Sequence, residues 1–400
     1  MANRVKKANT FVFWFFKLFI RPALYIMYRF RFEKNTSKGI KRPCFILSNH
    51  QTVIDQFAVC MGFNFGINFV GSDTLFRYGL KSKLMMLIAR PIPFSKGNSD
   101  LTAVRNMISV IKDGGCVAMF PSGNRSFYGE ESTIVKGIGK MARKFNAPLV
   151  LVRLRGGFFT MPRWKVKASK GKMRACVTKV VPAQELAAMT NAEVDEIIQK
   201  ELGFNDFEYN NTARIAFHGK HKAEYLESVL FYCPECSSLT GLYSQGDEFS
   251  CRGCGMKVRI NDTGFFEKIS KAQNVPDTIL QWSYKQLDYI KKFDYSGFSC
   301  KPLFSDDNIS LSIAERAKNE HFLGKGSIEF FCDRFTACGQ EFYFFETTMA
   351  VQGVRKLTIY NKDSVYAVEV PFRTNLMKYM ICGFHLRNNI LKNDVEYFGY

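Results

Sequence analysis

Short apolar runs alternate with longer helix-like stretches from residue 44 to residue 202. The apolar runs predict β-strands at 44–48, 67–71, 91–95, 116–120, 147–153 and 172–180. The intervening stretches predict helices at 54–63, 73–89, 99–113, 134–145 and 191–202. The last helix opens with Thr190 and Glu193 at the spacing of a capping box. Strands that alternate with helices in this way predict an α/β layer structure with a largely buried sheet.

One polar pair follows the first of these strands. His50 lies in the predicted turn after the run 44–48, and Asp55 lies in the first turn of the following helix. A histidine takes up a proton near neutral pH, and an aspartate can hold its far ring nitrogen. Five residues is not a helical repeat, so the pair would not face each other on one straight helix but could meet across the turn. The spacing alone is also compatible with an N-terminal aspartate and an unrelated loop histidine.

A second polar turn follows the strand at 116–120. Its sequence is Phe120-Pro121-Ser122-Gly123-Asn124-Arg125-Ser126. Proline stops the strand, glycine permits a tight turn, and the arginine lies within that turn. Backbone amides and a guanidinium group form a cradle for phosphate.

Together these motifs resemble those of the glycerolipid acyltransferase family, which contains the lysophosphatidic acid acyltransferases. Asn49, His50 and Asp55 match its motif Asn-His-x4-Asp, and residues 120–126 match Phe-Pro-Glu-Gly-Thr-Arg-Ser. Ser122 replaces the glutamate of that motif, and Asn124 replaces the usual threonine. The second motif corresponds to 90–96, with lysine in place of arginine at its end, and the fourth to 147–152. The resemblance covers roughly residues 40–190.

The resemblance implies transfer of a fatty acyl chain from acyl-CoA or acyl carrier protein to a hydroxyl of a lysophospholipid-type acceptor, in phospholipid synthesis or remodelling. His50 would be the general base and Asp55 would fix its tautomer. Arg125 and Lys96 would bind the acceptor's phosphate. The residues Asn49, Ser122 and Gly123 complete the predicted substrate site. Because serine is neutral at residue 122, we expect a lysolipid acceptor and poor use of glycerol 3-phosphate.

Charge and the N-terminus favour a membrane surface as partner. The formal net charge is +20, and the stretch Leu151–Val181 holds nine basic residues and no acidic ones. Basic residues that share a face attract anionic lipid. Residues 1–35 predict two short interfacial helices, separated at Pro22, that are too short to span a bilayer. We therefore expect a monotopic protein on the cytoplasmic face of a membrane.

Four cysteines form a second motif. Cys233 and Cys236 make one Cys-x2-Cys knuckle, and Cys251 and Cys254 make another, with Gly255 easing the second turn. Four thiolates at this spacing predict a structural zinc ribbon, for which two disulfides are the alternative. The other cysteines are scattered in apolar runs, which favours a reducing compartment.

Past the ribbon, a helix over 277–292 precedes segments of period two and a closing helix at 375–386. This pattern resembles a pleckstrin-homology-like module. The predicted domains are membrane-interface helices (1–35), an acyltransferase domain (36–225), a zinc ribbon (226–268), and a helix with a mostly antiparallel β domain and a C-terminal helix (269–400).

Two other function classes stay open. The serine at residue 122 and the extra domains favour a catalytically idle lipid-binding protein. The net charge and the ribbon favour a nucleic-acid binder, but no module that reads bases is visible, so we expect no nucleic-acid partner.

Overall fold

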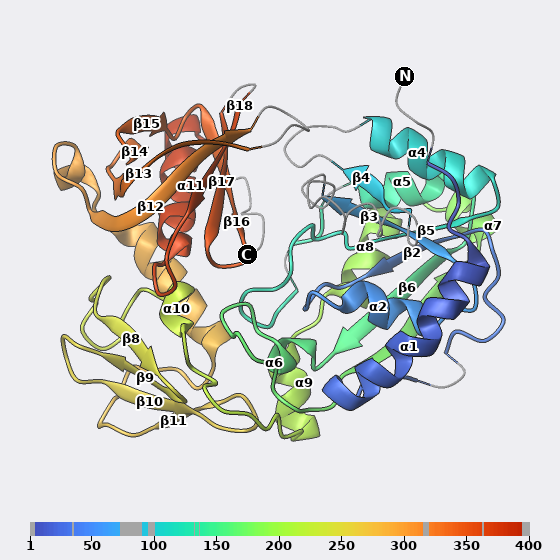
Figure 1. Ribbon diagram of the computed structural model, residues 1–400, viewed down its shortest axis with the longest axis horizontal. Helices are drawn as coiled ribbons and strands as arrows, with labels where there is room; N and C mark the ends of the chain where they lie inside the picture. The colour runs from blue at the N-terminus through green and yellow to red at the C-terminus, as the bar shows by residue number, and fades with distance from the viewer. Residues whose placement is uncertain are drawn as a thin grey trace. The chain divides into compact units, whose positions relative to one another are not determined.

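The computed structural model describes residues 5–33, 36–72, 90–94, 101–131, 133–135, 137–314, 320–361 and 364–393. The chain divides into two compact units. The N-terminal unit holds Met1–Pro162 and Ala168–Phe217, and the C-terminal unit holds Arg163–Lys167 and His218–Tyr397. Figure 1 shows the labelled elements of both.

A mixed sheet forms the centre of the N-terminal unit. Its strands, in spatial order, are β1 (Arg31–Phe32), β7 (Arg174–Val181), β6 (Leu149–Arg155), β2 (Cys44–Ser48), β5 (Cys116–Met119), β3 (Ile67–Ser72) and β4 (Ile92–Phe94). The strands from β6 to β4 are parallel, while β7 runs antiparallel to β6 and β1 parallel to β7. All six predicted strands are present, which confirms the predicted α/β sheet.

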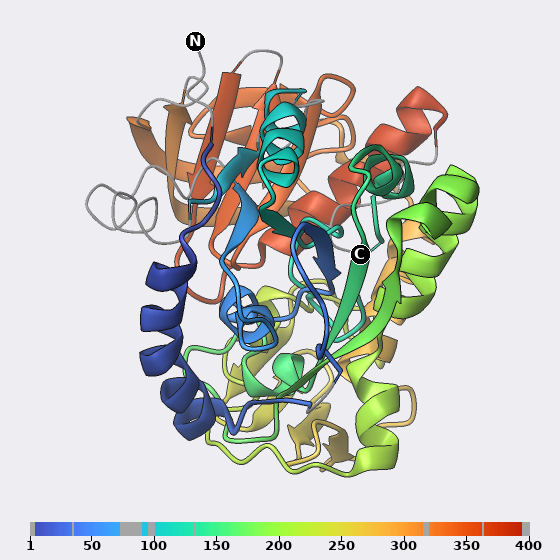
Figure 2. The same cartoon turned by 90° about the vertical axis from the view of Figure 1, so that its right-hand side faces the viewer.

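The helices of this unit cover both faces of the sheet. They are α1 (Thr10–Tyr28), α2 (Asp55–Cys60), α4 (Leu101–Lys112), α5 (Ile138–Lys144), α6 (Gly157–Thr160), α7 (Ala183–Ala188), α8 (Asn191–Leu202) and α9 (Asp206–Ala213). Figure 2 shows α1 and α8 along the outside of the unit. The capping box of Thr190 and Glu193 is formed at the start of α8. The predicted helix at 73–89 and the first two residues of the one at 99–113 lie outside the described residues.

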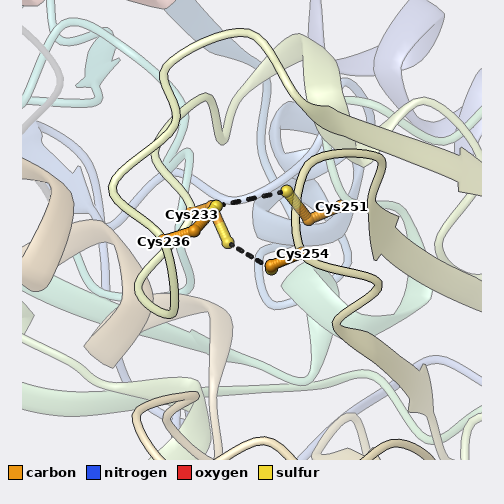
Figure 3. A group of neighbouring side chains, drawn as sticks. All are labelled: Cys233, Cys236, Cys251 and Cys254. Atoms are coloured by element: carbon orange, nitrogen blue, oxygen red, sulfur yellow. Dashed lines mark hydrogen bonds between the residues drawn. The ribbon is translucent and has the colours of Figure 1, made fainter.

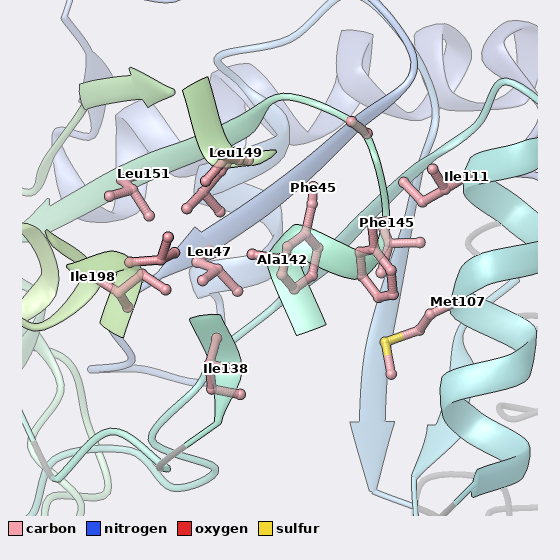
Figure 4. Packing of buried hydrophobic residues seen from close by; sticks show 14 of the residues in the cluster. Phe45, Leu47, Met107, Ile111, Ile138, Ala142, Phe145, Leu149, Leu151 and Ile198 are labelled. Atoms are coloured by element: carbon pink, nitrogen blue, oxygen red, sulfur yellow. The ribbon is translucent and has the colours of Figure 1, made fainter. Parts of the chain in front are cut away.

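Alternation along β2 explains why both of its faces are buried. Phe45 and Leu47 face the cluster that includes Met107 of α4 and Ile138 of α5 (Figure 4). Cys44 and Ile46, which alternate with them, face a second apolar cluster that also contains residues of α1 and α2. Because side chains alternate along a strand, one continuous apolar run supplies both layers of the core.

Helix α1 corrects the prediction of two helices separated at Pro22. It is one continuous helix of 19 residues with Pro22 inside it. A proline within a helix costs about 3 kcal/mol. Here the helix continues because Leu24 and Tyr28, beyond the proline, are buried in the core. By length and composition alone, α1 is long and apolar enough to cross a membrane. The sequence had predicted helices too short to do so.

The basic stretch Leu151–Val181 is divided between the two units. Its residues Arg163–Lys167 belong to the C-terminal unit, and the rest belong to the N-terminal unit. Within the latter, Arg153 donates to the main-chain carbonyls at the end of α8, including that of Glu201 at 2.7 Å. At least Arg153 of this stretch therefore bonds to the protein's own main chain.

The C-terminal unit contains two antiparallel sheets. The smaller has the order β11 (Phe266–Lys268), β10 (Lys257–Ile260), β9 (Glu248–Cys251) and β8 (Leu242–Gln245). The 3-10 turn η2 (Leu226–Ser228) precedes it, and α10 (Ile279–Lys292) follows. The burial of Trp282 of α10 against Phe249 of β9 packs the helix onto this sheet.

The larger sheet has the order β15 (Gln340–Tyr343), β14 (Arg334–Ala337), β13 (His321–Phe330), β12 (Phe304–Ala314), β18 (Ser364–Glu369), β17 (Lys356–Asn361) and β16 (Thr347–Gln352). The 3-10 turn η3 (Ser296–Phe298) precedes it, and α11 (Leu376–Leu391) closes the unit. Antiparallel strands followed by one helix were predicted here. The pleckstrin-homology-like interpretation stays a prediction.

Candidate functional site

The strand–turn–helix unit from β2 to α2 brings His50 and Asp55 together. The chain leaves β2 after Ser48, turns, and enters α2 at Asp55. His50 Nδ1 lies 2.8 Å from Asp55 Oδ2, and the aspartate side chain is fully buried while 19% of the histidine side chain is exposed. The turn therefore achieves the contact that five residues on a straight helix would not. The ring nitrogen opposite this bond, Nε2, is the one suited to exchange a proton with a substrate.

The Asp55 carboxylate also closes the turn itself. Oδ2 accepts the backbone N–H groups of Gln51 (2.5 Å) and Thr52 (2.8 Å), and Oδ1 accepts the Thr52 hydroxyl (2.5 Å). These bonds fix the carboxylate before any substrate binds. Pre-set geometry of this kind lets an aspartate hold a histidine ring in one orientation.

Asn49 is buried and bonded to the neighbouring strand. Its Nδ2 donates to the carbonyl of Leu154 at 2.9 Å, and its Oδ1 accepts the N–H of Leu154 at 2.7 Å. Both polar ends of the amide thus join the end of β2 to β6. This geometry gives Asn49 a positioning task, and its predicted contact with substrate stays a prediction.

The turn after β5 lies against His50. Because β2 and β5 are parallel neighbours, the segments that follow them meet at the same edge of the sheet. The ring of Phe120 stacks on the His50 ring, with centroids 4.1 Å apart and planes at 14°. The N–H of Ser126 donates to the carbonyl of His50 at 2.9 Å. Gly123 at the apex has a φ of +69° and is exposed, so the turn needs a residue that tolerates the left-handed region.

Arg125 is a half-buried cation near the pair. Burial lowers the pKa of its guanidinium, and the negative charge of Asp55 opposes that effect. The structure therefore brings Arg125 within electrostatic range of the histidine–aspartate pair. Lys96, the second predicted phosphate ligand, lies outside the described residues.

Ser122 is buried rather than open to solvent. Its hydroxyl donates to the carbonyl of Asn124 at 3.1 Å and interacts with the carboxyl group of Glu131. The carboxyl group of Glu131 therefore lies beside residue 122, the position at which the resembled motif has a glutamate. Whether Ser122 also contacts substrate stays a prediction.

Two buried acids near His50 were not predicted from the sequence. Burial raises the pKa of Glu131 to about 8, opposed by hydrogen bonds from Ser122 and from the backbone of His50, while the nearby Asp55 raises it further. Burial likewise raises the pKa of Asp206 to about 7, opposed by the backbone N–H groups of Gly156 and Phe158.

Asp206 holds the residue that follows the catalytic histidine candidate. Its Oδ1 accepts the N–H of Gly156 at 2.7 Å, and its Oδ2 accepts the side-chain amide of Gln51. Gln51 Oε1 in turn accepts the N–H of Gly157 at 3.0 Å. Neither Glu131 nor Asp206 lies in a recognisable motif. Each reaches the site from a segment distant in sequence, so no local sequence signal identifies it.

The four cysteines form one cluster in the C-terminal unit (Figure 3). All four Sγ atoms lie within 4.8 Å of one another. Cys233 and Cys254 Sγ are 3.8 Å apart, and Cys236 and Cys251 Sγ are 3.7 Å apart. A disulfide requires a sulfur–sulfur distance of about 2.05 Å. A tetrahedral metal with bonds to sulfur of about 2.3 Å places sulfurs roughly 3.8 Å apart, so the donor set fits a four-cysteine metal site.

The two knuckles have matching backbone turns. Ser237 N–H donates to the carbonyl of Cys233 at 2.9 Å, and Gly255 N–H donates to that of Cys251 at 3.0 Å. Both Ser237 and Gly255 have positive φ, at 59° and 73°. Gly255 therefore has the turn conformation that the sequence predicted for it.

Comparison with known proteins extends these observations. The family model described as Acyltransferase matches residues 28–155. The 1-acyl-sn-glycerol-3-phosphate acyltransferase BAT2, chloroplastic, of Brassica napus is 26% identical over 121 residues, which are 30% of this chain and 35% of the relative. The chain thus matches about a third of that relative's length.

Among solved structures, the 1-acyl-sn-glycerophosphate (LPA) acyltransferase PlsC of Thermotoga maritima is similar with a TM-score of 0.40 and 18% sequence identity. The similarity covers 47% of this chain and 77% of that one.

Proposed function

We infer that this chain, whose residues 28–155 match the family model described as Acyltransferase, transfers a fatty acyl chain from a thioester donor to the hydroxyl of a lysophospholipid-type acceptor. The observation that carries this inference is the 2.8 Å contact between His50 and Asp55 within the matched segment. Intact geometry of this pair argues against a catalytically idle lipid-binding protein.

His50 acts as the general base of the proposed reaction. Its Nε2 takes the proton of the acceptor hydroxyl while Asp55 holds Nδ1 and stabilises the imidazolium that forms. The acceptor oxygen attacks the thioester carbonyl of acyl-CoA or acyl carrier protein, and the donor's thiol leaves. Stacking on Phe120 keeps the ring plane fixed during this transfer.

Arg125 and Lys96 are the proposed ligands of the acceptor's phosphate. The burial that lowers the pKa of Arg125 also strengthens its attraction to a phosphate, because fewer water molecules screen the charge. Arg125 also lies close enough to Asp55 for the two charges to interact, so it is near the general base. A phosphorylated alcohol held there has its hydroxyl directed to His50.

The exposed face of α1 supports attachment to a membrane surface. Phe11, Phe15 and Leu18 follow one another at spacings of four and three residues, and their exposed fractions are 80%, 56% and 71%. On the inner side, Lys17 Nζ donates to the carbonyl of Phe63 at 2.6 Å. We propose that α1 lies along its own domain and inserts its outer face into the lipid interface, as a monotopic attachment on the cytoplasmic face.

Zinc is the proposed metal of the four-cysteine cluster. All four ligands are thiolates, so the metal would hold the two knuckles together and leave no position for catalysis. Cys233 and Cys251 are buried, and Cys251 is the last residue of β9.

An acyl-transfer assay on the purified protein tests the proposed function. The donor is labelled acyl-CoA or labelled acyl-loaded acyl carrier protein, and the acceptors are lysophosphatidic acid, other lysolipids and glycerol 3-phosphate. We expect transfer to lysolipid, and His50→Ala to lower the rate by about 10²–10⁴-fold. His218→Ala is the matched control, because His218 also contacts an aspartate, Asp262, at 2.7 Å but lies exposed in the C-terminal unit. Equal activity of His50→Ala and wild type would exclude this mechanism.

A further inference from the structure

One segment, residues 120–131, holds His50 from three sides. Phe120 stacks on its ring, and Ser126 N–H donates to its carbonyl. Glu131 completes the arrangement, because its Oε2 accepts the backbone N–H of His50 at 3.0 Å. Both main-chain polar groups of the histidine are therefore bonded to the same segment. Of the two bonds, only that to Glu131 depends on a side chain.

Glu131 is itself fixed by the chain that leads into α9. Its N–H donates to the carbonyl of Phe204 at 2.9 Å, and Asp206 N–H donates to the carbonyl of Gly129 at 2.8 Å. Glu130 and Asn205 form an isolated antiparallel bridge between these bonds. Two short segments are thus paired directly behind the Glu131 carboxyl group, which restricts its movement.

The carboxyl group of Glu131 lies beside residue 122, the position at which the resembled motif has a glutamate. Ser122 lies where that motif has glutamate, and its hydroxyl interacts with the Glu131 carboxyl. The second carboxyl oxygen, Oε1, is buried and has no hydrogen-bond partner within the described part of the chain. A buried carboxyl oxygen without a bond is costly, so a task at this position is expected.

We propose that Glu131 is a positioning residue for the His50–Asp55 pair, supplying from a distant loop position the carboxyl group that residue 122 lacks. It acts on the main chain of His50 and sets where the ring lies between Asp55 and the acceptor hydroxyl. The inference rests on the proposed acyl transfer for its kinetic readout. It predicts an effect on turnover and not on substrate binding, because Glu131 is bonded to the main chain of His50.

The first test replaces the carboxyl group while preserving bulk. Glu131→Met should lower kcat by about 10–100-fold, because a displacement of about 1 Å at a catalytic group costs about that much, with KM unchanged for donor and acceptor. Glu131→Gln should stay close to wild type, since its amide oxygen still accepts the His50 N–H. Glu130→Gln is the matched control: the same change one residue earlier, on an exposed side chain. A normal kcat in Glu131→Met, or a raised acceptor KM, would overturn the proposal.

The second test moves the carboxyl group. Ser122→Glu alone should lower kcat, because two adjoining buried carboxyl groups disfavour each other's charge and crowd one place. Adding Glu131→Ala should restore activity well above that of Glu131→Ala alone, since one carboxyl group then remains. A double variant no better than Glu131→Ala would contradict the proposal.

A readout without substrate separates this inference from the proposed function. NMR titration of the five histidines, with His50 assigned by His50→Ala, reports the ring's pKa and tautomer. Glu131→Met should shift the His50 signal and leave that of His218 unchanged. A His50 signal that does not shift in Glu131→Met would overturn the positioning role, whether or not the protein transfers acyl chains. A wild-type protein that is inactive on every lysolipid would refute the proposed function and leave the positioning role standing.

Discussion

At the scale of single residues, the site depends on which groups hold His50 rather than on His50 alone. Asp55 holds the ring, Ser126 and Glu131 hold the main chain, and Phe120 fixes the ring plane. Of these contacts, that to Asp55 was predicted from the sequence. The contact to Glu131 was missed because it joins residues 81 positions apart, outside any motif.

Glu131 gives stability a pH dependence of a defined sign. Its pKa is about 8 in the folded protein against an ordinary value of 4.5, so the native state binds more protons between these values. The free energy of unfolding should therefore fall as pH rises through that window. Glutamine does not ionise, so Glu131→Gln does not lose this stability. We therefore expect the Tm of Glu131→Gln to rise relative to that of wild type between about pH 5 and about pH 8.5.

The titratable residues next to Glu131 are Asp55, Asp206 and His50. They are present in both proteins, so the difference in Tm isolates the substituted group. Glu130→Gln, measured in the same way, should show a difference from wild type that does not vary with pH. A constant difference for Glu131→Gln as well would mean that its carboxyl group is ionised throughout.

Arg125 is predicted to act on the acceptor. Arg125→Ala should raise the acceptor KM by about 10-fold or more, and Arg125→Lys should restore it only partly, because an ammonium lacks the guanidinium's two parallel donors. Steady-state kinetics with varied lysolipid at saturating donor measures the effect. An unchanged acceptor KM in both variants would place the phosphate elsewhere.

At the scale of elements, α1 shows how packing overrides local preference. A helix with proline at its centre continues because residues on both sides of Pro22 contact the domain. Before it, Trp14 Nε1 donates to the carbonyl of Asn64 at 3.3 Å, and after it Leu24 is buried. The outer side keeps its apolar residues exposed.

This exposed face leads to a prediction on lipid binding. Leu18→Asp and Ile26→Asp place charges on residues that are 71% and 74% exposed, so folding should be unaffected while binding to vesicles weakens. Moving a charged group into the lipid interface is unfavourable. Sedimentation with anionic vesicles measures binding, and Leu323→Asp, at an exposed leucine of the C-terminal unit, is the control. Unaltered binding of both α1 variants would assign the attachment to another surface.

At the scale of the whole molecule, both units bury apolar side chains, and the four-cysteine cluster lies in the C-terminal unit. The N-terminal unit has apolar clusters on both faces of its sheet. The C-terminal unit contains the four-cysteine cluster, and it is tied together by Arg373, whose NH1 lies 2.5 Å from Glu227 Oε1 and which also pairs with Glu224. Loss of metal should therefore affect one unit first.

We expect one zinc per chain, and chelation should open the segment around 230–256 to proteolysis. The N-terminal unit should stay folded because its core contains none of these cysteines. Elemental analysis of protein purified under reducing conditions and mass mapping of proteolytic fragments check both statements. Cys300→Ser, at an exposed cysteine outside the cluster, is the control.

The sequence by itself determined the elements whose cause is local. Apolar runs predicted the strands from β2 to β7, and α8 begins and ends as predicted because its capping box is a local signal. The motif spacing likewise predicted the meeting of His50 and Asp55, because a strand, a turn and a helix leave few conformations for five residues.

Only the tertiary structure decided the rest. The continuity of α1 depends on a core assembled from several distant strands, and the division of the basic stretch depends on which unit each segment packs against. Glu131 and Asp206 gain raised pKa values because distant segments bury them beside Asp55. Burial and charge neighbours are properties of the folded chain, so no pattern in the neighbouring residues could have given them.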